Sequence, residues 1–534
     1  MTDRHPRYDA IVIGAGIEEL IAAGYLARAG LRVLQLERAT RVGGTAVTEE
    51  LVSGFRFDSC ADEVGPLPAR IARELGVVGL VPLSPDPVLF APQPNGDPLF
   101  LWRDAVRTRE SIRSRSPADA DRWEGFCEQM GRFAGWLEAL YLDSPPRPAA
   151  TGMKELASLL GFGRRLRGLG RTDMVEFLRL LPMPAYDLLN DWFESEALKA
   201  TLATGSITGV FQGPRSAGTA FVLLHHQVGR RAGEFGPRFM VRGGIGRISE
   251  ALAETAGRRG VDLRFAAEVA GLAVGEGRTL GVRLESGEEL AARAVVSGAD
   301  PRRTFLHLVD PIHLEPDFIS AVENIRFRGA RARVHLALSG LPRFQGPEGD
   351  EWLRGGGISI GPTLDYLEHA YDDAKHGAMS RRPILSARIP SLDDSTLCPP
   401  GRHVMSISMQ YAPYRLKDGP WDDARRQALG DLVVDTLAEY APDLPELILE
   451  RRVLTPQDME QNFGITEGHL YHGELALDQI LFMRPVPGWA HCRTPIRGLY
   501  LCGPGTHPGG GLTGASGRNA ARAVIEDLRT DREG

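Results

Sequence analysis

The sequence predicts an α/β fold with two lobes, one built around a βαβ unit and the other a mixed α+β structure under a helical cap. Two observations predict the first lobe: an apolar run, a glycine turn and a helical pattern open the chain at residues 8–29, and the same order returns at residues 496–528. A third observation predicts the second lobe, because residues 105–235 and 301–480 lack that order. At 534 residues the chain also exceeds the size at which a single hydrophobic core usually stops growing.

Composition and charge narrow the class of protein. Hydrophobic residues make up 43% of the chain and charged residues 25%, as in an ordinary soluble globular protein. The formal net charge of −7 argues against a broad nucleic-acid surface. The N-terminal stretch MTDRHPRYD lacks the apolar segment of a signal peptide, and no uncharged run suits a membrane-spanning helix. We therefore expect a cytoplasmic protein without a nucleic-acid partner. Peripheral contact with a membrane surface and the oligomeric state stay open.

The five cysteines argue against a metal site. They are scattered without a C-x-x-C pair, the spacing that structural zinc sites and dithiol redox centres use. A sparse, odd set of cysteines suits a reducing compartment. No metal ligands are predicted. One basic cluster, Arg164, Arg165, Arg167 and Arg171, is interpreted as a solvated face.

The opening stretch has the order of a dinucleotide-binding βαβ unit. Residues 8–13, YDAIVI, are an apolar run typical of a buried parallel strand. Gly14 permits a tight turn, and Gly16 leaves the backbone open to a phosphate at the N-terminus of a helix over residues 17–29. The next strand ends at Glu37, where a carboxylate accepts hydrogen bonds from ribose hydroxyls. The alternative is a βαβ unit that binds nothing.

Glu19 stands where the pattern G-x-G-x-x-G has its third glycine. That glycine lets the helix lie close to the strand. A glutamate there must force helix and strand apart or point its carboxylate at the phosphates, and Glu18 adds a second negative charge. Carboxylates stabilise a helix N-terminus by about 0.3–1 kcal/mol. Both side chains would therefore compete with the pyrophosphate of a ligand.

The residues after Glu37 carry a family resemblance. LERATRVGGTAVTEELVSGFRFD, residues 36–58, resembles the N-terminal signature of the phytoene-desaturase-like flavoproteins, a branch of the amine-oxidase-type FAD superfamily. The resemblance implies an FAD-binding Rossmann-like lobe. It also implies that Gly43 and Gly44 let the chain pass close to FAD, and that Arg38 belongs to the same site.

The C-terminal segment GLYLCGPGTHPGGGLTGASGRNAARAVIEDL, residues 498–528, resembles the flavin-binding motif of that family almost throughout. The helix opened by Gly514–Gly517 can face an oxygen of the pyrophosphate or the flavin ring with its N–H groups. The resemblance implies FAD contacts at Gly503, Gly511, Leu512 and Thr513.

Residues 238–300 return to the nucleotide-fold order, with a hairpin over 280–284 and 289–296. The resemblance implies that Val269 holds the adenine end of FAD through its backbone. Together these segments divide the chain into two lobes. The FAD-binding lobe has three parts, residues 1–104, 236–300 and 481–534. The substrate lobe has two parts, residues 105–235 (helical cap) and 301–480 (sheet and helices).

Periodicity predicts the elements of the second lobe. Residues 331–338 and 403–410 alternate apolar and polar side chains as strands do, and we expect them to form the floor of a substrate site. Residues 421–440 form an amphipathic helix. In the cap, helices are expected over residues 121–142, 173–189 and 219–228, either as a cover for an apolar cavity or as a plain helical core.

Two histidines are candidates for acid–base catalysis. GHLYHGEL, residues 468–475, resembles a segment of the branch related to pyridine-nucleotide-disulfide-oxidoreductase-like proteins, although nothing in the sequence supports disulfide chemistry. His472 lies in this segment and His507 in the C-terminal motif, and the resemblance places both near the flavin. A structural role is the alternative for each. His225 and His226 are adjacent, so their side chains diverge on a helix and are interpreted as structural.

The resemblance implies an FAD-dependent oxidoreductase that desaturates or isomerises an apolar small molecule, with the chemistry carried by the flavin. The sequence contains no G-x-S-x-G, Walker or H-E-x-x-H motif. Glu19 leaves an alternative open. Rab escort proteins and GDP-dissociation inhibitors share the superfamily fold, carry a glutamate at the matching glycine and bind no flavin. This chain would then bind a hydrophobic ligand or a partner, or catalyse a redox-neutral reaction, with no cofactor.

Overall fold

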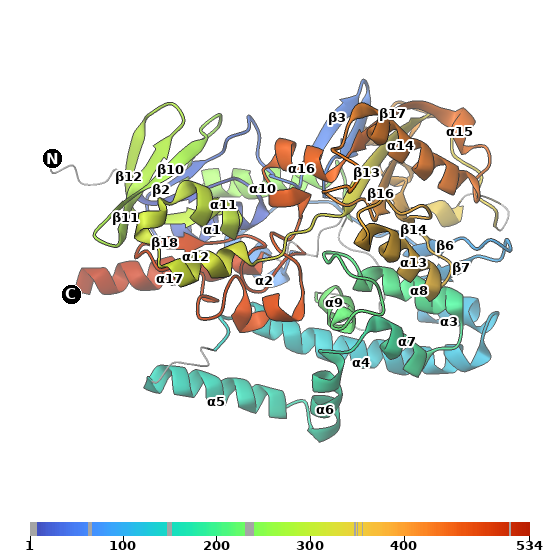
Figure 1. Ribbon diagram of the computed structural model, residues 1–534, viewed down its shortest axis with the longest axis horizontal. Coiled ribbons are helices and arrows are strands. Elements are labelled where there is room, and N and C mark those ends of the chain that lie inside the picture. The colour runs from blue at the N-terminus through green and yellow to red at the C-terminus, as the bar shows by residue number, and fades with distance from the viewer. Residues whose placement is uncertain are drawn as a thin grey trace.

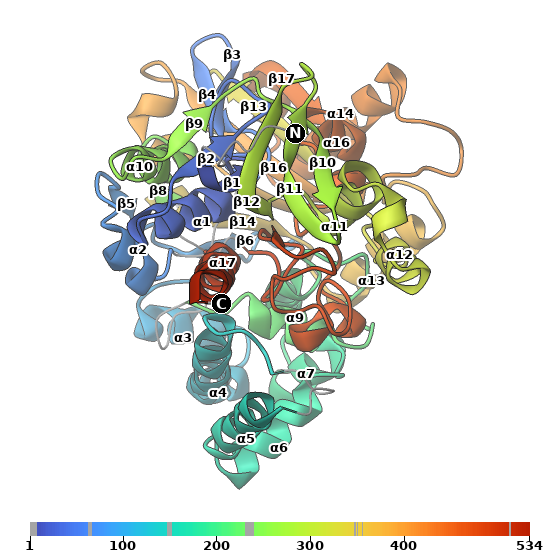
Figure 2. The same ribbon diagram turned by 90° about the vertical axis from the view of Figure 1, so that its left-hand side faces the viewer.

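The computed structural model contains two large sheets and a layer of helices (Figures 1 and 2). It describes residues 8–533 with the exception of 62–66, 147–151, 230–239, 347–348, 350, 355 and 512–513. The predicted α/β fold with a Rossmann-like lobe, a second α+β lobe and a helical cap is confirmed.

The first sheet is built around β1, which pairs in parallel with β2 on one side and with β12 on the other. β9 continues the parallel sheet beside β2, and β18 continues it beside β12. β10 and β11 join β12 as an antiparallel meander, which contains the predicted hairpin. The strands of this sheet are β1 (Tyr8–Ile13), β2 (Val33–Leu36), β9 (Asp262–Arg264), β10 (Val269–Gly275), β11 (Arg278–Leu284), β12 (Glu289–Ser297) and β18 (Leu499–Leu501).

Side chains from both faces of β1 are buried, which explains why its sequence is apolar without alternation. On one face Ala10 and Val12 pack in a core with helices α1, α10 and α17. On the other face Ile11 and Ile13 pack with the β10–β11 meander and helix α12. These helices are α1 (Ile17–Arg28), α10 (Gly246–Gly257), α12 (Pro316–Glu323) and α17 (Ala515–Glu533).

The second sheet alternates an apolar face with a polar face. Its order is β17-β13-β16-β15-β14-β6-β7. Val334 and Leu336 of β13 pack against helix α14, whereas Arg333 and His335 lie opposite serines of β16 on the other face. The strands and the helix are β17 (Ile448–Leu454), β13 (Arg331–Leu338), β16 (His403–Gln410), β15 (Ile384–Arg388), β14 (Gly357–Ile360), β6 (Leu89–Ala91), β7 (Leu99–Leu101) and α14 (Asp423–Ala438). The predicted strands 331–338 and 403–410 are confirmed, and the helix expected over 421–440 is α14.

The polar face of the second sheet is joined to the first lobe. His335 is hydrogen-bonded through Nε2 to the carbonyl oxygen of Ser59 at 3.1 Å and through Nδ1 to Oγ of Ser406 at 3.0 Å. Arg333 donates to the carbonyl oxygen of Asp58 at 3.3 Å. Residues 58 and 59 lie at the end of a short hairpin of β3 (Thr48–Val52) and β4 (Phe55–Asp58). Strands β6 and β7 belong to this second sheet, although they lie within residues 1–104. The lobe boundaries themselves remain predictions.

The helical layer lies below both sheets in Figure 1. Its longest helix begins after Ser116, whose hydroxyl accepts a hydrogen bond from the backbone of Asp119, and Pro117 suits the first turn. The helix predicted over residues 173–189 is wrong as a single element, because Pro182 and Pro184 have no N–H to continue it. The layer contains α3 (Ala105–Arg113), α4 (Pro117–Tyr141), α5 (Met153–Arg167), α6 (Arg171–Leu180), α7 (Ala185–Trp192), α8 (Glu196–Ala203) and α9 (Thr219–His225).

The remaining elements connect these layers. They are α2 (Ala69–Leu75), α11 (Pro301–Arg303), α13 (Leu364–Lys375), α15 (Leu444–Leu447), α16 (Pro456–Phe463), β5 (Pro82–Leu83) and β8 (Met240–Val241).

Candidate functional site

A cavity of about 450 Å³ lies at the carboxyl ends of β1 and β2, where open parallel sheets bind their ligands. Its walls come from the turn after β1, the end of β2, the start of β10 and the segment around residue 472. The residues that line it include these predicted ones: Gly14, Gly16, Glu37, Arg38, Gly43, Gly44, Val269 and His472.

The two glycine turns at this cavity are held together by the backbone. The N–H of Gly43 donates to the carbonyl oxygen of Ala15 at 2.8 Å. Gly14 and Gly43 have φ angles of 96° and 121°, which L side chains rarely adopt. A Cβ on Gly43 would also lie 2.5 Å from the carbonyl oxygen of Ala46. Both turns therefore require glycine, as the sequence pattern indicates.

Glu37 is fixed at the end of β2 by two backbone donors. Its Oε2 accepts from the N–H of Ala15 at 2.7 Å, and its Oε1 accepts from the N–H of Ala39 at 2.8 Å. The carboxylate is buried yet lines the cavity. Each oxygen has a further lone pair, so Glu37 can also accept hydrogen bonds from a ligand. Its predicted contact with ribose hydroxyls stays a prediction.

The carboxyl group of Glu19 lies in a hollow beside the first glycine turn. A Cβ on Gly16 would be 2.5 Å from its Oε2, and a Cβ on Gly298 would be 2.3 Å from its Oε1. A Cβ on Gly503 would be 3.2 Å from the same Oε1. Gly298 and Gly503 thus supply the space that the missing third glycine would give. The carboxyl lines the cavity beside Gly16, the residue at which the sequence predicts a phosphate.

The environment of Glu19 favours its neutral form. The side chain is buried, and the thiol of Cys502 contacts Oε1 at 3.6 Å. Burial raises the pKa of the carboxyl to about 8, and the nearby charges of Glu18 and Glu37 act in the same direction. The carboxyl is therefore mostly protonated at neutral pH.

Glu18 occupies a second anion position. Its Oε1 accepts from the N–H of Gly514 at 2.8 Å, and its Oε2 accepts from the N–H of Gly517 at 2.9 Å and from Oγ of Ser516 at 3.1 Å. Burial raises its pKa, against the effect of these hydrogen bonds. The sequence predicts that the N–H groups of Gly514–Gly517 face the pyrophosphate or flavin. In the structure two of these groups are bound to Glu18, so this expectation is wrong for them.

The two ends of the cavity therefore differ in how they suit a dinucleotide. At the end where the sequence predicts the adenosine, Glu37 and the start of β10 at Val269 form the walls. The end where it predicts the phosphates holds the carboxyl of Glu19. A pyrophosphate fits there only after that carboxyl moves.

The residues of the C-terminal segment that are predicted to contact FAD lie in different places. Gly503 lies against Glu19, and its N–H donates to Oγ of Ser516 at 2.9 Å. Gly511 lies against His225, because a Cβ there would be 3.6 Å from Nε2 of that histidine. Leu512 and Thr513 fall outside the described residues.

The two candidate histidines lie in different surroundings. His472 lines the cavity, and its Nδ1 is 3.8 Å from the place of a Cβ on Gly503. That Nδ1 is buried and has no hydrogen-bond partner among the described residues. Burial lowers the pKa of His472 to about 4, against the opposing charge of Asp300, so the imidazole is neutral at pH 7.

His507 lies in the core instead. Its ring packs edge-on against Tyr141 of α4 at a centroid distance of 5.8 Å, and its Nε2 is 3.4 Å from the carbonyl oxygen of Leu140. Burial lowers its pKa to about 4. The structure therefore brings only His472 of this pair to the cavity.

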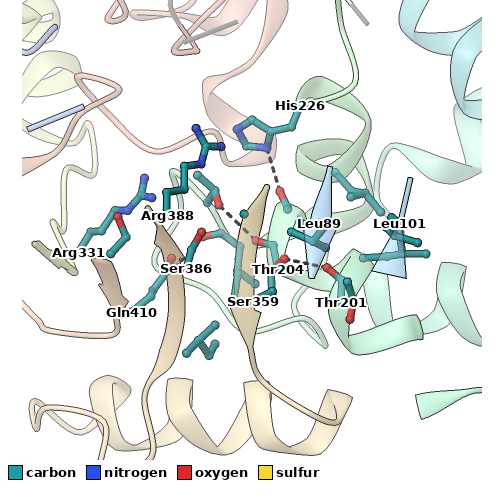
Figure 3. Close-up of a pocket in the computed structure, with 18 of the residues that line it drawn as sticks. Leu89, Leu101, Thr201, Thr204, His226, Arg331, Ser359, Ser386, Arg388 and Gln410 are labelled. Atoms are coloured by element: carbon teal, nitrogen blue, oxygen red, sulfur yellow. Dashed lines mark hydrogen bonds between the residues drawn. The ribbon is translucent and has the colours of Figure 1, made fainter. Parts of the chain in front are cut away.

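A second cavity, of about 110 Å³, lies between the polar face of the second sheet and helices α8 and α9 (Figure 3). Leu89, Leu101, Leu202 and Leu223 give it apolar walls. The side chains of Arg331 and Arg388 rise from the same side of the sheet. Together with them the floor contains polar residues of β14, β15 and β16, namely Ser359, Ser386, Ser408 and Gln410.

The segment that contains Tyr471 and His472 links residues of the two cavities. His472 lines the first cavity, and the hydroxyl of Tyr471 is 3.0 Å from Nε2 of His226, which lines the second. His225 is hydrogen-bonded to the hydroxyl of Tyr141 and to the carbonyl oxygen of Gly510, both at 2.7 Å. Tyr471 and Gly298 could not be recognised from the sequence, since their contacts are with residues distant along the chain.

Within the described residues, no helix is long and apolar enough to cross a membrane. That part of the chain also contains no cluster of histidine, cysteine or acidic residues suited to hold a metal ion.

The chain matches a known protein family. The model of the family "Flavin containing amine oxidoreductase" matches residues 20–525. The chain belongs to this family. The predicted superfamily is therefore confirmed, and the family supports a flavin-dependent oxidoreductase.

Three relatives match nearly the whole chain. A rat protein named pyridine nucleotide-disulfide oxidoreductase domain-containing protein 2 is 37% identical over 98% of this chain and 94% of its own length. A limonene dehydrogenase subunit of Castellaniella defragrans is 28% identical over 97% and 95%. A phytoene desaturase (lycopene-forming) of Pseudescherichia vulneris is 26% identical over 97% and 99%. These relatives confirm the predicted branch.

A solved structure supports the fold. An oxidoreductase from Methanosarcina mazei superposes with a TM-score of 0.61 over 97% of this chain and 99% of that chain, at 15% identity.

Proposed function

We propose that this protein is an FAD-dependent oxidoreductase that desaturates or isomerises an apolar small molecule in the cytoplasm. The observation that carries the proposal is the cavity at the ends of β1 and β2, which has the glycine turns and Glu37 that a dinucleotide needs. All five cysteines are free thiols, which supports a reducing compartment.

Different residues of the cavity would bind different parts of the cofactor. Glu37 and the backbone at Val269 would hold the adenosine half of FAD, and the turn over Gly14 and Gly16 would lie against its phosphates. A bound flavin would supply the redox chemistry by accepting a hydride or electrons. His472 would exchange a proton at Nδ1, since the residue lines the cavity, its imidazole is neutral at pH 7, and this buried atom has no hydrogen-bond partner among the described residues.

The second cavity supports the proposed substrate class. Its leucines exclude water and favour an apolar molecule, while its serines suit one polar group on that molecule. The names of two relatives, a limonene dehydrogenase and a phytoene desaturase, also favour oxidation of this kind.

The cofactor is tested by purifying the full chain without added flavin. A yellow protein that releases FAD on denaturation supports the proposal. A colourless protein that neither retains FAD nor binds it in a titration overturns it. Anaerobic bleaching of the flavin by apolar alkenes then tests the substrate class, and bleaching by amines alone contradicts it.

A second candidate function follows from Glu18 and Glu19. Because their carboxyl groups occupy the hollow beside Gly16 and the start of α17, the fold is complete without a bound anion. The chain would then bind a hydrophobic ligand or partner without flavin, or catalyse a redox-neutral reaction. Failure of the Glu19→Gly variant to bind FAD favours this second candidate, whereas binding by this variant alone identifies Glu19 as the cause.

A further inference from the structure

Helices α5 and α6 lie at the end of the molecule farthest from both sheets, and the two views agree on this position (Figures 1 and 2). They are attached to the body through Trp136 of α4. Its ring packs against Phe162 of α5 at 5.9 Å and against Phe177 of α6 at 4.8 Å between centroids. Each helix thus has one face bound to α4 and another face directed away from it.

The outward faces of these helices are apolar. On α5, Met153, Leu156 and Leu160 are exposed by 86%, 53% and 67%, and their spacing places them on one side of the helix. On α6, Val175 and Leu178 are exposed by 52% and 47% and also share a side. Single exposed apolar residues are common in soluble proteins, but five on two consecutive helices form a patch of the kind that binds another surface.

Arginines continue the same sides of both helices. Arg164 and Arg167 follow Leu160 at helical spacing, and Arg171 precedes Val175 and Leu178 in the same way. All three are exposed. Residues 156–172 contain four arginines and no acidic residue, in a chain whose net charge is −7. The fourth is Arg165, which pairs with Asp143 at 3.2 Å. The acidic residues of α6, Asp173 and Glu176, are paired with Arg132 and Arg179. The patch is therefore both apolar and basic.

We propose that α5 and α6 dock this protein on the surface of an anionic lipid bilayer. The apolar side chains would enter the boundary between headgroups and acyl chains, and the arginines would contact lipid phosphates. Charge complementarity selects this occupant. A two-fold contact between two copies would bring the arginines of one patch against those of the other. A nucleic acid would leave the five apolar side chains without a partner.

The docking surface is connected to the second cavity through the helical layer. α6 leads directly to α7, and α7 contacts α8 and α9, which wall that cavity. An apolar molecule dissolved in the bilayer would thus reach the protein at the layer that covers the cavity. The docking itself requires no flavin and does not depend on the proposed oxidoreductase activity.

The test is sedimentation of the full chain with lipid vesicles. We expect binding to vesicles that contain equal parts of phosphatidylcholine and phosphatidylglycerol, and weaker binding at high salt because salt screens the arginines. The variant Met153→Ser/Leu156→Ser/Leu160→Ser should bind at least about tenfold more weakly. The variant Arg164→Gln/Arg167→Gln should bind about thirtyfold more weakly to anionic vesicles and lose most of the salt dependence.

The matched control is Ile312→Ser, which removes an apolar side chain that is 82% exposed in the segment before α12. It should leave vesicle binding unchanged. Absence of binding by the wild-type chain, or equal binding by the triple serine variant and the wild type, overturns the proposal. Size-exclusion chromatography with light scattering completes the test, because a dimer that the triple variant abolishes would assign the patch to a second copy instead.

Discussion

Glu37 and Glu19 are buried carboxyl groups of the same cavity, yet they relate to a ligand in opposite ways. Glu37 is held by two backbone N–H groups and keeps its oxygens at the wall. Glu19 extends into the hollow between Gly16, Gly298 and Gly503, where the thiol of Cys502 contacts its carboxyl at 3.6 Å. Glu37 therefore lines the cavity where the sequence predicts the adenosine, whereas Glu19 fills the space where it predicts the phosphates.

The difference lies in the donors that the backbone provides. At the end of β2 the chain turns so that Ala15 and Ala39 direct N–H groups at the carboxylate, which stabilises a charge in a buried place. At Glu19 a backbone hydrogen bond does not offset the effect of burial, which raises the pKa of the carboxyl to about 8. The hollow beside Gly16 is thus filled by a neutral acid.

The largest expected effect is on stability, for the variant Glu19→Gln. The wild-type chain must bind a proton at Glu19 when it folds, because the pKa rises from 4.5 to about 8. The contribution of Glu19 to stability is therefore fully present below pH 4.5 and is lost as the pH rises towards 8, by about 1.4 kcal/mol per unit. Glutamine has no such dependence, so the variant should gain about 3 kcal/mol over the wild type at pH 7. Urea unfolding of flavin-free protein at several pH values measures this difference.

Glu110→Gln is the control for this prediction, since it removes an exposed carboxyl on α3. Its stability relative to the wild type should stay constant over the same pH range. A constant difference for Glu19→Gln as well would show that the hollow beside Gly16 holds a charged carboxylate, and the contrast between the two glutamates would then disappear.

The opposite sign is expected for Glu37→Ala. This change leaves the N–H groups of Ala15 and Ala39 without their acceptor, which should cost about 2 kcal/mol of stability at pH 7. The same variant should bind FAD more weakly, because the ribose loses its acceptor. Denaturant unfolding and a flavin titration measure the two effects. Unchanged stability would contradict the description of Glu37 as a fixed wall.

Much of the first lobe could be predicted because its signals are local. The strand over residues 8–13, the turn at Gly14 and the helix that follows each depend on neighbours in sequence. The place of the Glu19 side chain could not be predicted in the same way. It depends on Gly298 and Gly503, which meet it only after the sheet has formed.

The second lobe shows the same limit. Alternation identified β13 and β16, and their register explains why one face is polar. The three-residue strands β6 and β7 carry no signal for their partner, so the sequence could not place them in the second sheet. The candidate histidines differ for a related reason. Both lie in glycine-bearing segments, but only contacts with α4 reveal that His507 is a core residue.

The smallest expected effect is on the affinity for FAD. It separates the effect of the charge of the Glu19 side chain from the effect of its size. Wild-type protein should bind FAD more weakly as the pH rises above about 8, since Glu19 ionises beside the pyrophosphate. Glu19→Gly removes both charge and bulk and should bind about tenfold more tightly than the wild type at pH 9. Glu19→Gln removes the charge alone, so its affinity should not change with pH. If the Glu19→Gln variant binds FAD as weakly as the wild type at pH 9, the size of the side chain excludes the pyrophosphate. Glu19 would then block the phosphate position in either protonation state.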